Sequence, residues 1–198
     1  MIDFIYSVDK AVFLWIYGLS GHVPFIDGLM KLITNDIFMP MIIFLILIAM
    51  WFASHDQKAR ELNQRAVFSA LLSMGISNII VKICNILYDR PRPYDVLPNI
   101  QTLFHHSADS SFPSNMAAVF FAVAMGAWIY NRKLGWCLLV PAVLVSFSRV
   151  YVGIHYPLDI VGAFFTAIVS TGIAFLVLKV IEPLPTKVIK LMCKIYLA

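Results

Sequence analysis

Charged residues are scarce in this sequence. Asp, Glu, Lys and Arg together make up 13% of the 198 residues, whereas hydrophobic residues make up 61%. A soluble globular domain has about a quarter of its residues charged and about half apolar. The composition therefore excludes a soluble domain. It indicates an integral membrane protein whose length suits one compact helical domain, residues 1–198.

Cysteine and targeting signals are also sparse. The three cysteines, Cys84, Cys137 and Cys193, lie in or beside apolar segments, and their spacing fits neither a zinc site nor a disulfide framework. No basic start precedes a long apolar run and a small-residue cleavage site, so no removable signal peptide is expected. The modest net charge of +4 bears on orientation in the membrane, and no nucleic-acid partner is expected.

Long apolar runs are abundant. Five of them predict transmembrane helices, at residues 37–54, 66–88, 114–130, 134–148 and 158–178. Charges interrupt residues 1–35, which predict two interfacial helices, and residues 183–198 predict a basic amphipathic tail. The expected fold is thus an all-α polytopic membrane bundle over residues 37–181. A sixth span within residues 11–34 is the alternative.

Basic residues gather on one side of this bundle. Nine of the fifteen lie in the polar loop expected at 55–65, the turn 131–133 and the C-terminal region: Lys58, Arg60, Arg65, Arg132, Lys133, Lys179, Lys187, Lys190 and Lys194. The positive-inside rule makes that side cytoplasmic. Residues 89–113 and 149–157 then lie together at the outer face.

Three polar stretches, residues 89–93, 111–116 and 148–159, are expected to meet at that outer face. They carry side chains and backbone amides that can bind a phosphate. Arginine suits phosphate oxygens, and Arg90, Arg92 and Arg149 are all candidates for binding phosphate. Ser114 and the backbone amides of Asn115 and Met116 begin a predicted helix, whose N-terminus favours an anion.

A histidine completes the set. His155 is the strong nucleophile candidate, and Asp159, four residues later, can hold its ring in one tautomer. No Asp, Glu or His cluster has the spacing of a metal site, so neither a metal nor another cofactor is expected. The pattern predicts phosphoryl transfer through a phosphohistidine that water then hydrolyses.

These residues resemble a known family. Its most specific motif is Ser-Arg, five residues, His, three residues and Asp, which is matched by Ser148, Arg149, His155 and Asp159. Two weaker motifs are matched in the same order by Pro91-Arg92-Pro93 and Phe112-Pro113-Ser114. The sequence resembles the type 2 phosphatidic acid phosphatase superfamily over residues 1–185, especially the short undecaprenyl-diphosphatases linked to bacitracin resistance. The resemblance implies that His155 is the nucleophile, that Asp159 orients it, and that Arg92, Arg149 and Ser114 bind phosphate.

The first departure from the family pattern concerns a lysine. The family has one seven residues before the motif arginine, where this sequence has Asn85. Lys82 lies three residues earlier, about one helical turn, and its long side chain is the candidate replacement.

The second departure concerns the proton for the leaving group. The family's general-acid histidine is replaced by Met116, whose thioether cannot donate a proton. A lipid monophosphate leaves a diphosphate as a weak base, with a pKa of about 6, whereas an alkoxide needs the proton badly. The substitution therefore favours diphosphate over monoester substrates. His105 and His106, on the same loop, are alternative proton donors.

The expected function is hydrolysis of a polyprenyl diphosphate, held in the bilayer by its tail, to the monophosphate and phosphate. By resemblance this would take place at the outer face of a bacterial inner membrane, in carrier-lipid recycling that lowers bacitracin sensitivity. Because of Met116, the alternative is a protein that binds a lipid phosphate but whose catalysis is weakened or lost, whether as a natural paralogue or as an engineered variant. A transporter fits poorly, since no paired interrupted helices are evident. The sequence leaves the oligomeric state open.

Overall fold

The computed structural model describes residues 2–54, 56–106 and 109–194, and the described part is helical. In chain order the helices are α1 (Ile2–Tyr17), α2 (Pro24–Thr34), α3 (Phe38–Phe52), α4 (Gln57–Leu87), α5 (Pro93–Val96), α6 (Asn115–Tyr130), α7 (Arg132–Tyr151), α8 (Pro157–Val180) and α9 (Leu184–Lys194). The all-α fold class is confirmed.

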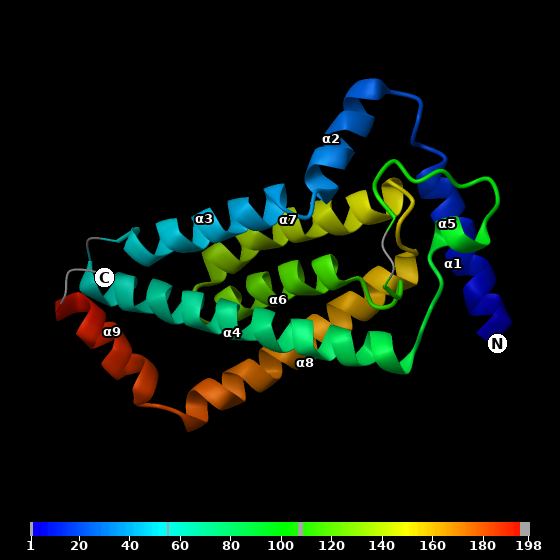
Figure 1. Ribbon diagram of the computed structural model, residues 1–198. Helices are drawn as coiled ribbons and strands as arrows, with labels where there is room; N and C mark the ends of the chain where they lie inside the picture. The colour runs from blue at the N-terminus through cyan, green and yellow to red at the C-terminus, as the bar shows by residue number, and fades with distance from the viewer. Residues whose placement is uncertain (1, 55, 107–108, 195–198) are drawn as a thin grey trace.

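Five long helices form the body of the protein. In Figure 1, α3, α4, α6, α7 and α8 run alongside one another, with α1, α2 and α5 at one end and α9 at the other. By length and composition, α4, α7 and α8 can each cross a membrane. Helices α2 and α3 pass the same test together but bend by 59° at their junction, and α6 is a shorter apolar helix.

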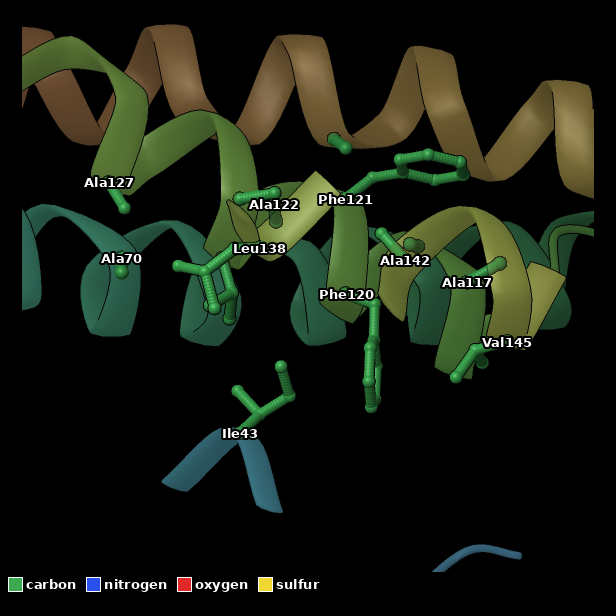
Figure 2. Close-up of a cluster of buried hydrophobic side chains, with 14 of the residues drawn as sticks. Ile43, Ala70, Ala117, Phe120, Phe121, Ala122, Ala127, Leu138, Ala142 and Val145 are labelled. Carbon is green, nitrogen blue, oxygen red and sulfur yellow. The ribbon is translucent and has the colours of Figure 1, made fainter. Parts of the chain in front are cut away.

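Helix α6 is the centre of the bundle. It packs against α4, α7 and α8, and Figure 2 shows Ala117, Phe120, Ala122 and Ala127 of α6 among the buried side chains of its neighbours. Small residues let these helices approach closely, as is common in membranes. A Cβ on Gly126 of α6 would lie 2.8 Å from the Cα of Ala70 on α4.

Two expectations about segment limits are wrong. The sixth-span alternative within residues 11–34 is not one helix, because α1 ends at Tyr17 and α2 begins at Pro24. The polar segment 55–65, expected as a loop, belongs mostly to α4. The Asp56 carboxylate caps that helix by accepting a hydrogen bond from the Ala59 amide at 2.9 Å, which makes an early start favourable.

Helix ends at the α1 end of the bundle hold the polar stretches in place. Helix α7 ends before Gly153, whose φ of +89° is readily adopted only by glycine and turns the chain back toward the bundle. Pro157 then starts α8 at a position where its missing N–H costs nothing. His155 lies between these two helix ends.

Candidate active site

The three polar stretches of the sequence come together at the end of the bundle where α6 and α8 begin. The Ser111 amide donates to the Arg90 carbonyl at 2.8 Å, and the Ser114 amide donates to the Asp159 carbonyl at 3.2 Å. The segment after α4, the start of α6 and the start of α8 are therefore tied by their backbones. The expectation that they meet is confirmed.

His155 is buried, with 1% of its surface exposed. Its Nδ1 lies 2.9 Å from the Ser111 carbonyl oxygen, which fixes the proton on Nδ1. Nε2 then carries a lone pair and no proton, and it accepts a long hydrogen bond from Arg92 Nη1 at 3.5 Å. The unprotonated nitrogen is the one that a nucleophile needs.

Asp159 is fully buried and supports the His155 ring through Ser111. Its Oδ2 accepts hydrogen bonds from the Ser111 hydroxyl at 2.5 Å and from the Tyr156 amide at 2.8 Å. The same oxygen is 3.6 Å from His155 Nδ1, beyond a hydrogen bond. The structure thus places Ser111 between Asp159 and the ring, whereas the sequence analysis expected direct contact.

Arg90 does not reach the phosphate site that the sequence analysis assigned to it. Its Nη1 pairs with Asp159 Oδ1 at 2.6 Å, and its Nη2 pairs with Asp9 Oδ2 at 2.6 Å. The guanidinium also lies 4.3 Å from the centre of the Tyr156 ring. Because both terminal nitrogens bind carboxylates, Arg90 stabilises the back of the site.

Asp9 was missed by the sequence analysis. It is a buried carboxylate on α1, and its second oxygen accepts a hydrogen bond from the Leu158 amide at 2.8 Å. The available signal was an acidic residue in a mainly apolar helix, a costly placement that normally requires a partner. Through Arg90 and Leu158, Asp9 ties α1 to the active site.

A cavity of about 350 Å³ opens in front of His155. Several candidates from the sequence share its lining, together with carboxylates that the sequence did not assign: His155, Arg92, Arg149, Asn115, Met116, Asp36 and Asp109. Ser114, at the N-cap of α6, has a fully buried side chain whose hydroxyl has no hydrogen-bond partner among the described residues.

Each of the two arginines that line the cavity forms an ion pair with a carboxylate. Arg92 Nη2 pairs with Asp109 Oδ1 at 2.7 Å, and Arg149 Nη1 pairs with Asp36 Oδ1 at 2.9 Å. Arg92 and Arg149 are 3% and 6% exposed, so their charges are largely removed from water and bind an anion strongly. Arg149 Nε is buried without a hydrogen-bond partner among the described residues. Two acidic groups therefore stand where a phosphate would be recognised.

Lys82 lies outside this cavity. With Asn85, the residue at the family's lysine position, it lines an adjoining cavity of about 640 Å³. The two cavities have four lining residues in common: Asn78, Asp109, Ser110 and Asn115. Lys82 thus lines a cavity that neighbours the one in front of His155.

The two loop histidines are set apart from His155. His105 Nε2 lies 3.4 Å from Asp36 Oδ2, whereas the ring of His106 packs edge-on against Tyr94 at 4.4 Å between centres. Neither contributes to the cavity lining. Across residues 2–54, 56–106 and 109–194, no three His, Cys, Asp or Glu side chains gather in a group able to hold a metal ion.

Burial sets the charge of His155. Removal from water lowers the pKa of its imidazole to about 4. The Asp159 carboxylate opposes this shift, and the nearby charges of Arg149 and Arg92 add to it. The ring is therefore neutral at neutral pH. A neutral, oriented imidazole in a cavity with two arginines, at the end of a membrane bundle, is an arrangement suited to phosphoryl transfer.

Comparison with known proteins identifies the family. The model of the PAP2 superfamily matches residues 66–182. Undecaprenyl-diphosphatase BcrC of Bacillus subtilis is 30% identical over 187 residues, covering 94% of this chain and 90% of that protein. The chain belongs to the PAP2 superfamily and is a membrane-embedded lipid phosphatase.

Two further similarities agree with this family. The putative undecaprenyl-diphosphatase YbjG of Escherichia coli is 26% identical over 166 residues, covering 83% of this chain and 79% of that protein. The crystal structure of a PAP2-type phosphatidylglycerolphosphate phosphatase from Bacillus subtilis has a TM-score of 0.62 at 23% identity, covering 90% of this chain and 88% of that chain. This structural similarity supports the fold.

Removing the Asp9 carboxylate tests the ion pairs behind the site. Asp9→Ala leaves Arg90 with one of its two carboxylates, and breaking a buried pair costs about 3–5 kcal/mol. We expect a lower melting temperature and a slower reaction. Asp3→Ala, on the exposed face of the same helix, is the matched control. Wild-type melting and rate in Asp9→Ala would contradict this role.

The protonation of His155 gives a second prediction. An imidazole has an ordinary pKa of about 6.5, so between pH ~4 and 6.5 this ring stays neutral while an unperturbed one becomes charged. NMR of the ¹³C-histidine-labelled protein in micelles should show one resonance with a midpoint near pH 4, absent from His155→Asn. A His155 midpoint near 6.5 would show that the ring is not desolvated.

Proposed function

We propose that this lipid phosphatase hydrolyses a polyprenyl diphosphate, most directly undecaprenyl diphosphate, to the monophosphate and inorganic phosphate. The observation that carries the proposal is His155 Nε2, free of a proton, facing the cavity that Arg92 and Arg149 also line. The printed names of the relatives from Bacillus subtilis and Escherichia coli support the choice of lipid.

In the first step, the terminal phosphate takes the place of the Asp36 and Asp109 carboxylates on Arg149 and Arg92. Nε2 of His155 attacks the phosphorus, the bond from phosphorus to the bridging oxygen breaks, and the lipid monophosphate leaves. The Ser111 carbonyl accepts the Nδ1 hydrogen bond throughout, and the Asp159 charge 3.6 Å away favours the positive ring that forms. In the second step, water attacks the phosphohistidine and releases inorganic phosphate.

The adjoining cavity adds a positive charge beside the site. Lys82 supplies the cation there, and four residues line both this cavity and the one in front of His155. This charge would attract the anionic head of the substrate, whose apolar tail leaves toward the bilayer. Lys82 in this role takes the part of the lysine that Asn85 replaces.

Met116 favours a diphosphate over a monoester. Its side chain lines the cavity but offers no proton, and a leaving lipid monophosphate needs one less than an alkoxide does. The predicted orientation puts the site at the outer face of a bacterial inner membrane. There the reaction would recycle the carrier lipid of cell-wall assembly and lower sensitivity to bacitracin.

Phosphate release from purified protein tests this function. In detergent with EDTA, we expect the wild type to release phosphate from farnesyl or undecaprenyl diphosphate. His155→Ala should abolish release because it removes the nucleophile, and His106→Ala, which changes a histidine outside the cavity, should retain it. Release that survives in His155→Ala, or that requires an added divalent metal, would contradict the phosphohistidine route.

Met116 also supports a second candidate, a lipid-phosphate-binding protein whose catalysis is weakened. The same assay separates the two. No release by the wild type, together with release by Met116→His, would favour the weakened protein, since a single imidazole would then restore the missing acid.

A further inference from the structure

Arg149 brings an acidic side chain next to Met116. Its Nη1 lies 2.9 Å from Asp36 Oδ1, 3.5 Å from Met116 Sδ and 3.1 Å from the Thr34 carbonyl oxygen. The carboxylate of Asp36 and the thioether of Met116 therefore contact the same nitrogen. Asp36 comes from the junction of α2 and α3, far from Met116 in the sequence.

The two arginines of the cavity have different neighbours. Arg92 contacts His155 Nε2, whereas Arg149 contacts Met116 and Asp36. In phosphoryl transfer the leaving oxygen lies across the phosphorus from the attacking atom. A phosphate attacked by Nε2 thus directs its leaving oxygen away from His155. Arg149, Met116 and Asp36 line the same cavity, and among the described residues none of them hydrogen-bonds to His155.

We propose that Asp36 is the acid that protonates the leaving lipid phosphate, in the place that Met116 leaves without a proton donor. This inference rests on the phosphatase function proposed above. Asp36 lines the cavity, so its carboxyl group can touch the substrate, and unlike a thioether it can carry a proton.

Substrate binding would bring the phosphate and the Asp36 carboxyl group to the same arginine. In the structure Arg149 forms an ion pair with Asp36. When a phosphate takes over that arginine, the Asp36 carboxyl group is released from the ion pair and lies next to the phosphate. The side chain is 45% exposed, so water can deliver the proton. His105, whose Nε2 is 3.4 Å from Asp36 Oδ2 and which is 57% exposed, offers a second route from solvent.

The bonds and protons of the reaction can then be assigned to these residues. The Nε2–phosphorus bond forms while the phosphorus–oxygen bond breaks, and the bridging oxygen keeps the electron pair and takes the proton from Asp36. In the second step water attacks the phosphorus, the oxygen–phosphorus bond forms, and the Nε2–phosphorus bond breaks with its electron pair returning to Nε2. Inorganic phosphate leaves with both protons of the water, and solvent protonates Asp36 again.

Asp36→Asn tests this role, because asparagine keeps the shape of the side chain but carries no acidic proton. With farnesyl diphosphate, we expect kcat to fall by about 10²-fold, within the range for loss of a general acid. KM should stay the same or fall, since Arg149 is freed for the substrate. With 2,4-dinitrophenyl phosphate, whose leaving group needs no proton, kcat should stay within a few-fold of the wild type.

Two further variants make the result specific. Met116→His added to Asp36→Asn should restore turnover of farnesyl diphosphate, because an imidazole would then lie beside the same arginine nitrogen. Asp109→Asn, which removes the carboxylate on the other cavity arginine, should change both substrates by the same factor. Wild-type kcat in Asp36→Asn, or an equal loss on both substrates without rescue by Met116→His, would overturn the role of Asp36. A wild type that releases no phosphate from either lipid diphosphate would overturn the phosphatase proposal as well.

Discussion

The site depends on one buried ion-pair network, Asp9–Arg90–Asp159. Each of these charges costs several kcal/mol to remove from water unless strong partners replace the solvent. Here Arg90 binds both carboxylates at 2.6 Å, and the Leu158 and Tyr156 amides and the Ser111 hydroxyl supply further hydrogen bonds. A single guanidinium therefore joins α1, the segment after α4 and the start of α8. The N-terminal helix is part of the active-site framework, in addition to any contact with the membrane surface.

From this network a short chain of contacts leads to Nε2 of His155, the proposed nucleophile. Asp159 fixes the Ser111 hydroxyl, and the Ser111 carbonyl fixes Nδ1 of His155. The lone pair of Nε2 then faces Arg92 and the cavity. Desolvation keeps this ring neutral, and the same desolvation strengthens the two arginines as anion binders. The proposed nucleophile and the proposed phosphate site thus depend on the same exclusion of water.

Local patterns in the sequence predicted a large part of this structure. The apolar runs predicted the long helices, and the spacing of Arg149, His155 and Asp159 placed them at adjoining helix ends. Contacts between distant segments were not predictable: Asp9 and Asp36 gave no local signal of the arginines they would meet. Arg90 and Arg92 look alike in the sequence, yet Arg90 faces carboxylates behind the site and Arg92 faces the cavity. The early start of α4 was missed because its capping residue Asp56 lies in a segment rich in charge.

Met116 offers no proton to the cavity, while the Ser111 carbonyl still fixes Nδ1 of His155. The account therefore rests on a covalent phosphate on His155. Rapid acid-free quenching of the enzyme during turnover of diphosphate labelled with ³²P at its terminal phosphate measures that bond directly. The account predicts protein-bound label that is stable to base, labile to acid and located on His155. Turnover of the wild type without any such label at times shorter than one catalytic cycle would contradict it.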